Sequence, residues 1–148
     1  MTTRITVTPR ELGYHFPAEW ERHSATWLSY PHNEASWPGK IQTIFPYYHR
    51  FIKELSGHEL VNINVSGKEM EDDVARALQE AGVNMENIKL HRLATNDAWC
   101  RDHGPAFVIN PGAENPKAIV NWKYNGWGGK YPAEMDTTIP QRVGKILG

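Results

Sequence analysis

Two kinds of hydrophobic spacing alternate along this chain of 148 residues, and they restrict the fold more than any other feature. Short runs rich in β-branched and aromatic residues are followed by longer segments whose apolar residues recur every three or four positions. The first spacing is typical of strands, and the second is typical of amphipathic helices. The resulting order of strand, helix, strand, helix and strand predicts an α/β fold.

These spacings predict five strands and two helices. The strands are expected at 25–30, 60–65, 89–93, 106–109 and 118–122, and the helices near 39–55 and 67–81. The last two strands flank a loop of Pro, Gly and Asn, which favours a hairpin. Pro46 lies inside the first helix and implies a kink. Ser66 and Glu69 match a capping box at the start of the second helix, and Gly82 is a natural end for it.

Both ends of the chain give weaker patterns. Residues 1–24 contain turn-forming residues from Pro9 onward and predict an irregular lead-in. The first twelve residues hold no continuous apolar core, so they do not match a signal peptide. Residues 139–148 resemble the beginning of a helix that stops without settling.

Composition excludes several classes of function. A formal net charge of -1 lacks the basic stripe that nucleic-acid binding normally needs, and the apolar runs are far too short for a membrane span. We therefore predict no nucleic-acid partner and no membrane partner. One cysteine cannot form an internal disulfide, which favours the cytoplasm. Glycine spacing for a phosphate or dinucleotide loop is missing, as is zinc-ligand spacing, so we expect no metal and no cofactor.

The stretch NDAWCRDHGP, residues 96–105, concentrates side chains suited to chemistry. Its Asn-Asp and Gly-Pro pairs favour a turn, and on a helical or tight turn Trp99 and Asp102 share a face. A carboxylate beside an aromatic plane suits a guanidinium, because this planar cation presents its donors as a fork that one carboxylate can accept. The ring face adds a cation–π attraction of about 0.5–2 kcal/mol. The pair therefore predicts a guanidinium-binding site.

A structural interpretation of the same stretch stays open, and the residues alone favour it. An aspartate before Gly-Pro, such as Asp102, often bonds its own backbone in a turn. Arg101 can pair with Asp97 or with Asp102. Cys100 would leave such a turn on another face, so we interpret it as an inert, half-buried thiol. Its spacing from His103 nevertheless allows a Cys–His contact.

Tryptophan is the other unusual component of the sequence. The chain has six tryptophans, which is many for its length. Four of them stand beside polar or turn-forming residues: Trp20, Trp37, Trp99 and Trp127. Ordinary packing explains such residues, and so does a pocket lined by tryptophan.

Three segments, distributed over most of the chain, follow in this order: FPAEWERHSATWLSYPHNEASWPG (16–39), DAWCRDHGPAFV (97–108) and NWKYNGWGGKY (121–131). They resemble the N-terminal motif, the Trp-x-Arg-Asp-x-Gly-Pro motif and the Asn-x-Trp-Gly-Gly-Lys motif of the agmatine deiminase / Porphyromonas-type peptidylarginine deiminase family. The resemblance implies a pentein-like, five-bladed α/β-propeller of ββαβ units. Residues 1–148 would form roughly its first two blades, as the N-terminal part of a single deiminase domain.

The resemblance also assigns roles to residues. Asp102 matches the family aspartate that binds the substrate guanidinium, and Trp99 matches a tryptophan that lines the same pocket. Trp127 and Lys130 match the Trp-Gly-Gly-Lys motif, whose role would be structural or pocket-forming. Cys100 stands at a variable position of its motif and does not match the family nucleophile.

The implied activity is hydrolysis of a guanidine group to a ureido group with release of ammonia. Family catalysis uses a cysteine thiolate, which forms a covalent thiouronium that water then cleaves, together with a His-x-Asp pair and a glutamate. All of these are expected after residue 148. No nucleophile is therefore assigned in this chain, and we expect residues 1–148 alone to be inactive.

The substrate stays open between two classes. Agmatine, which would give N-carbamoylputrescine in putrescine and polyamine synthesis, is preferred because the 16–39 and 121–131 segments resemble the small-substrate members most. Protein arginine, as in a peptidylarginine deiminase, is the alternative. A non-catalytic guanidinium-binding or assembly fragment is an alternative of another class. Uncovered sides of the second blade would favour a homo-oligomer or dependence on further residues.

Overall fold

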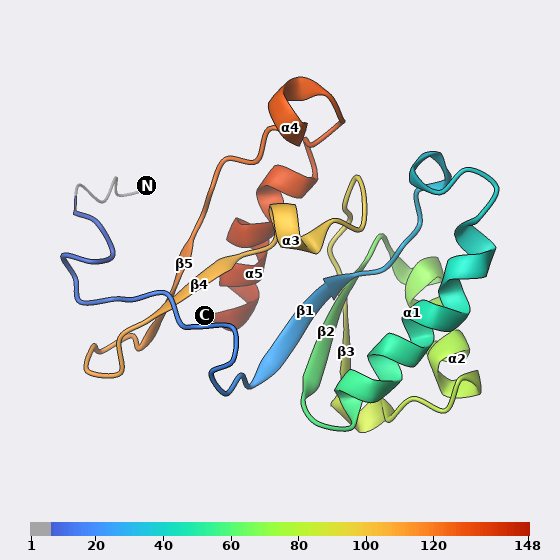
Figure 1. Ribbon diagram of the computed structural model, residues 1–148, viewed down its shortest axis with the longest axis horizontal. Helices are drawn as coiled ribbons and strands as arrows, with labels where there is room; N and C mark the ends of the chain where they lie inside the picture. The colour runs from blue at the N-terminus through green and yellow to red at the C-terminus, as the bar shows by residue number, and fades with distance from the viewer. Residues whose placement is uncertain (1–6) are drawn as a thin grey trace.

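The computed structural model describes residues 7–148, and its elements confirm the predicted α/β class (Figure 1). Three parallel strands form one sheet in the order β1, β2, β3, and two helices connect them. The bounds of these elements are β1 Ala25–Ser29, α1 Ile41–Ser56, β2 Leu60–Val65, α2 Lys68–Glu80 and β3 Ile88–Arg92. The predicted strands and helices of this half are therefore confirmed.

The second half of the chain forms a two-stranded antiparallel sheet with three short helices. The bounds are α3 Cys100–His103, β4 Ala106–Ile109, β5 Lys117–Val120, α4 Gly126–Gly129 and α5 Ile139–Leu147. Three 3₁₀ turns complete the order: η1 Glu34–Ser36, η2 Met85–Asn87 and η3 Asp136–Thr138. The predicted hairpin is confirmed. Neither sheet closes on itself within the described residues, so the propeller stays a prediction.

Alternation along β2 places its apolar side chains under the two helices. Val61 and Ile63 are fully buried there and pack with Ile52 of α1 and Leu78 of α2. Burying a side chain of this size contributes about 1.5–3 kcal/mol, so this cluster is the main core. Figure 1 shows both helices on the same side of the parallel sheet.

The opposite face of the parallel sheet is polar. The Trp27 indole N–H donates to Asn64 Oδ1 at 2.8 Å, and Asn64 Nδ2 donates to Ser29 Oγ at 3.0 Å. His91 Nε2 lies 2.8 Å from Asn62 Oδ1, and the His91 ring stacks on Trp27 with centroids 4.8 Å apart. Ser29, Asn62 and Asn64 are buried, and the hydrogen bonds compensate for their lost contact with water.

Helix α5 is regular, so the expectation of an unsettled helix at 139–148 is wrong. Ile139 and Val143 lie one turn apart and are both fully buried against Leu93. Phe107 and Ile119 of the hairpin pack on the same small cluster. Helix α5 is stabilised by these distant contacts, and its own short segment shows no sign of them.

The start of α2 also differs from prediction. Gly67 occupies the N-cap position, and no side chain caps the helix. The Ser66 backbone N–H instead donates to Met70 Sδ at 3.2 Å. The predicted capping box is wrong because Ser66 stands one residue too early. Gly82 does end the helix, with a left-handed φ of 69°, and α1 continues through Pro46 to its end.

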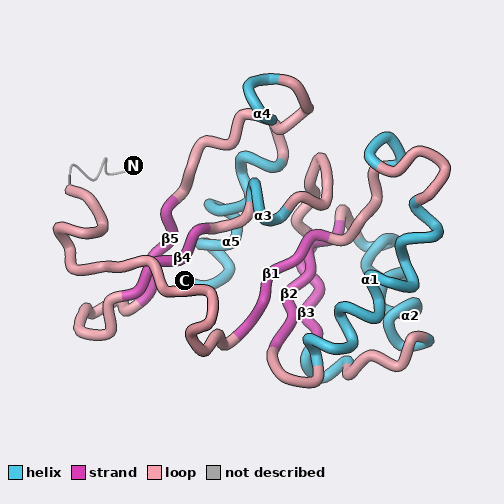
Figure 2. Tube along the Cα trace, in the orientation of Figure 1, coloured by secondary structure: helices cyan, strands magenta, loops and turns pink. Residues whose placement is uncertain are grey.

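The lead-in is irregular as predicted, apart from one bridge between His15 and Ile109, and Figure 2 draws it as loop. Residues 1–6, on which part of the signal-peptide prediction falls, lie outside the described residues. Between residues 7 and 148, no helix has the length and apolar character needed to cross a membrane.

The carboxyl ends of β1 and β3 lie at the same edge of the parallel sheet. Residues 30–37 leave that edge after β1, and residues 93–99 leave it after β3. In open α/β sheets this edge is where ligands usually bind. The predicted guanidinium motif therefore begins where a site is expected.

Candidate guanidinium-binding site

The motif 96–105 folds into the helical turn that its sequence predicts. The backbone N–H groups of Asp102 and His103 both donate to the Trp99 carbonyl, at 3.0 and 3.1 Å. The Gly104 N–H donates to the Cys100 carbonyl at 2.8 Å and closes the turn. Trp99 and Asp102 are thus one turn apart, in the geometry that lets their side chains share a face.

Both predicted ligand groups are accessible. The Trp99 side chain is 47% exposed, and Asp102 is exposed as well. Within residues 7–148 the Asp102 carboxylate has neither a hydrogen-bond partner nor an ion-pair partner, so it does not bond its own backbone as a turn-former would. An unpaired carboxylate beside an exposed indole can accept the forked donors of a guanidinium.

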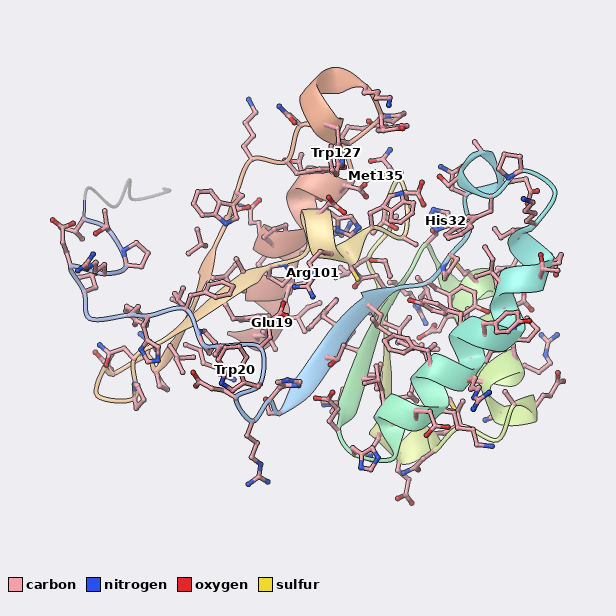
Figure 3. All side chains as sticks on the ribbon, in the orientation of Figure 1. Glu19, Trp20, His32, Arg101, Trp127 and Met135 are labelled. Atoms are coloured by element: carbon pink, nitrogen blue, oxygen red, sulfur yellow. The ribbon has the colours of Figure 1, made fainter. Side chains whose placement is uncertain are left out.

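Arg101 is not available to that carboxylate. Its Nη1 lies 2.6 Å from Glu19 Oε1, and both side chains are exposed (Figure 3). This contact joins the turn to the lead-in. Both pairings proposed for Arg101 from the sequence, with Asp97 or with Asp102, are therefore wrong.

Asp97 is buried and fully occupied by donors from the chain. Its Oδ2 accepts from Asn33 Nδ2 at 3.1 Å and from the Ser36 hydroxyl, and its Oδ1 accepts from the Ala98 N–H at 2.7 Å. A buried carboxylate needs such donors, because losing its hydration without them is costly. Asp97 therefore fastens the motif to the loop after β1.

Trp37, the residue after η1, stacks on Trp99. The ring centroids are 5.9 Å apart and the ring planes differ by 23°. The sequence placed Trp37 among four notable tryptophans without indicating a role for it. Its position in the loop at the carboxyl end of β1 is the signal that could have identified it.

A second buried carboxylate holds the other side of the motif. Asp136, which is 2% exposed, accepts from the Asn96 backbone N–H at 2.7 Å. The Asn96 side-chain oxygen in turn accepts from the backbone N–H groups of Met135 and Asp136, at 2.8 and 3.2 Å. Burial raises the pKa of Asp136. This reciprocal arrangement ties the motif to the segment before α5.

His103 faces this carboxylate and not the thiol. Its Nε2 lies 3.3 Å from the Asp97 carbonyl oxygen and 4.0 Å from Asp136 Oδ1. Its side chain is fully buried, and Nδ1 has no partner among residues 7–148. The Cys–His contact that the spacing allowed is therefore not formed: no hydrogen bond joins Cys100 to His103.

Cys100 is the half-buried thiol that the sequence predicted. It packs against the core between the sheet and the two long helices. Burial raises the pKa of the Cys100 thiol, and the smaller opposing effects of a backbone hydrogen bond of Ser29 and of the Arg101 charge do not offset it. A thiol of raised pKa is a poor nucleophile at neutral pH.

The Trp-Gly-Gly-Lys segment forms a left-handed turn next to this motif. Trp127, with φ 60° and ψ 49°, is the one non-glycine residue of positive φ between residues 7 and 148. Trp127 is 69% exposed, and Figure 3 labels it at α4. The Tyr124 ring lies 6.5 Å from the His103 ring, measured between centroids, so the start of this segment lies near the motif. Burial, followed by the charges of Asp102 and Asp136, raises the pKa of Tyr124.

The structure does not bring every predicted residue together. No ring contact joins Trp127 to Trp99, and Lys130 lies over the Tyr131 ring at 5.2 Å from its centroid. A cavity of about 580 Å³ lies between α1 and α2 and reaches the loop after β1; Phe45, His49 and His32 contribute to its lining, and Trp99 and Asp102 do not. Within the described residues, no group of three His, Cys, Asp or Glu side chains could hold a metal ion. The exposed carboxylate and indole on α3 remain the best supported site.

Comparison with known proteins identifies the family of the chain. The model of the Porphyromonas-type peptidyl-arginine deiminase family matches residues 15–148. Agmatine deiminase of Ectopseudomonas mendocina is 34% identical over 99% of this chain and 39% of its own length. That of Pseudomonas syringae pv. tomato is 34% identical over 97% of this chain and 38% of its own. The chain thus spans less than two fifths of the length of these curated relatives.

Solved structures share the fold. A structural-genomics X-ray structure provisionally assigned as an agmatine deiminase superposes with a TM-score of 0.81 at 28% identity, covering 95% of this chain and 38% of its own. A cysteine-to-serine variant of C. jejuni agmatine deiminase with its substrate bound gives a TM-score of 0.73 at 22% identity, over 89% of this chain and 36% of its own. The second likeness concerns the fold alone.

Proposed function

We propose, because the chain belongs to the Porphyromonas-type peptidyl-arginine deiminase family, that it supplies the guanidinium-binding wall of a guanidine hydrolase. The observation that carries the proposal is the turn on which Asp102, unpaired and exposed, stands one turn from the exposed Trp99. In this role the carboxylate accepts the guanidinium donors, and the indole face attracts the cation. Trp127 borders the same site from the left-handed turn.

The reaction we propose converts agmatine and water to N-carbamoylputrescine and ammonia. A thiolate adds to the guanidinium carbon, ammonia leaves, and water cleaves the covalent thiouronium to restore the thiol. The buried Cys100 does not suit this task, because its pKa is raised and its thiol packs into the core. We therefore assign the nucleophile and its proton shuttle to residues other than these 148.

Agmatine is the preferred substrate for two reasons. Curated relatives at 34% identity carry the name agmatine deiminase. Agmatine also has no carboxylate, so its pocket needs no arginine clamp, and Arg101, the arginine of the turn, is paired with Glu19. Peptidylarginine is the second candidate, since the matching family is described by that activity.

The proposal also covers the fold of the whole domain, its cellular compartment and its self-association. The two sheets would be roughly the first two blades of a pentein-like propeller of ββαβ units, supported by the TM-score of 0.81 over 95% of the chain. We place the protein in the cytoplasm, because residues 1–148 hold a single cysteine and therefore no disulfide of their own. Exposed aromatic side chains such as Trp20 and Trp122 support self-association of the isolated chain.

Titration of residues 1–148 with agmatine tests the binding role. Nitrogen-15 NMR follows the indole signal of Trp99, assigned with Trp99→Phe. Asp102→Asn is expected to weaken binding by up to about fivefold, because an exposed pair contributes about 0.2–1 kcal/mol. Asp73→Asn, which removes an exposed carboxylate on α2, is the matched control. Butylammonium distinguishes guanidinium recognition from attraction to any cation.

The proposal fails if agmatine leaves the Trp99 signal unchanged, or if Asp102→Asn binds as the unaltered chain does. In an active deiminase that contains these residues, the pair would be covered and desolvated. There Asp102→Asn is expected to lower kcat/KM by about 10²-fold or more, with the Asp73→Asn variant near wild type.

A further inference from the structure

The loops that follow β1 and β3 are joined to each other by side chains, although β2 separates the two strands. The His32 ring lies between two backbone carbonyl oxygens. Its Nδ1 is 3.1 Å from the Tyr30 oxygen, and its Nε2 is 3.1 Å from the Thr95 oxygen. His32 thus connects the start of one loop to the start of the other.

Asp97 makes the next connection along the same two loops. Its Oδ2 accepts from Asn33 and from Ser36, which begin and end the turn η1. Asn33 at the same time caps η1, because its Oδ1 accepts from the Ala35 N–H at 3.0 Å. The position of η1 therefore depends on the Asp97 carboxylate.

These hydrogen bonds also fix the positions of Trp37 and Trp99. Trp37 is the residue after η1, and its N–H donates to the Glu34 carbonyl at 3.1 Å. Trp99 stands two residues after Asp97. Since both backbones are fastened to one carboxylate, their rings meet in the stack with centroids 5.9 Å apart.

We propose that Asp97 is a positioning residue that stacks Trp37 on Trp99, which makes Trp37 the second ring of the guanidinium-binding wall. This inference rests on the proposed function. The two neighbouring carboxylates, Asp97 and Asp102, then have different roles. Asp97 is buried and its oxygens are occupied by donors from the chain, so it cannot receive a guanidinium, whereas Asp102 is exposed and unpaired.

The stack matters because cation–π attraction depends on where the ring face points. A cation must lie within about 6 Å of the ring centroid. An exposed indole that is free to rotate loses part of this attraction to the entropy of being fixed. Trp37, half-buried and stacked on Trp99, restricts that rotation.

Circular dichroism gives a readout of the stack itself. Two indoles held this close couple their far-ultraviolet transitions, which produces a paired positive and negative band that isolated tryptophans lack. Trp37→Phe is a clean reference, because the Trp37 indole N–H has no partner among residues 7–148 and its removal breaks no hydrogen bond there. It should abolish the paired band and leave the helix signal unchanged.

The decisive variants are made in residues 1–148. Asp97→Asn places an amide N–H where the Asn33 amide donates, so the paired band should weaken. Agmatine binding, measured on the Trp99 indole signal, should weaken by about two- to fivefold. This is the part of the affinity that an exposed cation–π contact contributes. Trp37→Leu should abolish the paired band and weaken agmatine binding by the same factor. Asp73→Asn again serves as the control.

A double variant tests position directly. Asn33→Asp combined with Asp97→Asn exchanges donor and acceptor, keeps an oxygen to cap η1, and lets residue 97 donate to residue 33. It should recover most of the paired band and of the agmatine affinity. Unchanged band and affinity in Asp97→Asn would overturn the inference, as would a lost band with unchanged affinity.

The outcomes also separate this inference from the proposed function. If Asp102→Asn weakens agmatine binding while Trp37→Leu does not, the guanidinium site stands and the role of Trp37 is wrong. If the unaltered chain binds no agmatine, the proposed function fails. The paired band and its recovery in the double variant would then still decide whether Asp97 positions the two rings.

Discussion

The reactivity of Cys100 gives the most direct test of where the nucleophile of this family member lies. A thiolate is the reactive form, and an ordinary thiol here has a reference pKa of 9.0. At pH 7, two units lower, about 1% of such a thiol is ionised. Burial raises the pKa of Cys100 above that reference, so its thiolate fraction must be smaller still. The core around the sulfur also hinders access by a reagent.

Iodoacetamide labelling measures both effects. The native chain at pH 7 should be alkylated at least about tenfold more slowly than the chain unfolded in urea, because unfolding restores both access and an ordinary pKa. Mass spectrometry counts the labelled chains. Cys100→Ser should remove all labelling, since the chain has no other cysteine. Agmatine should not change the native rate, because Trp99 and Asp102 are exposed whereas the thiol packs against the core.

A native chain that reacts faster than the unfolded one would refute this reasoning. It would mean that the fold lowers the pKa of Cys100, as enzymes do with catalytic thiols. Loss of an agmatine-hydrolysing activity in Cys100→Ser would lead to the same conclusion. The motif would then contain the nucleophile, and the assignment of that role to other residues would be wrong.

Three further outcomes are expected. Residues 1–148 alone should release no ammonia from agmatine in a coupled ammonia assay, and turnover that vanishes in Cys100→Ser would contradict this. Burial, and then the charge of Lys89, lowers the pKa of His91 below 6.5. Its contribution to stability should therefore be present above pH 6.5 and be lost as pH falls through the lowered value, and urea unfolding of His91→Asn should show a weaker loss. Gly126→Ala should destabilise the chain by about 1–3 kcal/mol in the same assay, because φ there is 61° and an added Cβ would lie 2.0 Å from the Tyr131 carbonyl oxygen.

The sequence predicted those elements whose own residues carry the pattern. Val61, Ile63 and Val65 alternate in one short run, and the helix that follows β2 shows its apolar face in one short segment. Helix α5 was predicted only as a beginning that stops without settling, because its segment of nine residues is short and its burial depends on Leu93, far earlier in the chain. Periodicity detects amphipathic segments and does not detect the distant partner that stabilises a weak one.

The same limit applies to the site. Trp99 and Asp102 are three residues apart, so local geometry alone suggested that they act together. The role of Asp97 could not be predicted, because Asn33 and Ser36 precede it by 64 and 61 residues. The stack of Trp37 on Trp99 has the same cause. Contacts between the loops of two strands that are not neighbours follow from topology, which a single sequence does not reveal.

The left-handed backbone conformation of Trp127 affects how stabilised variants of this chain should be selected. A bulky side chain in the left-handed region costs on the order of 1–2 kcal/mol relative to glycine, and this one is 69% exposed, so little packing compensates. Selection for thermal stability alone would favour glycine or asparagine at position 127, and the more stable variants would be kept. A library screened only for folding would thereby discard the indole that we propose borders the guanidinium site. Turnover would have to be scored alongside melting temperature to keep it.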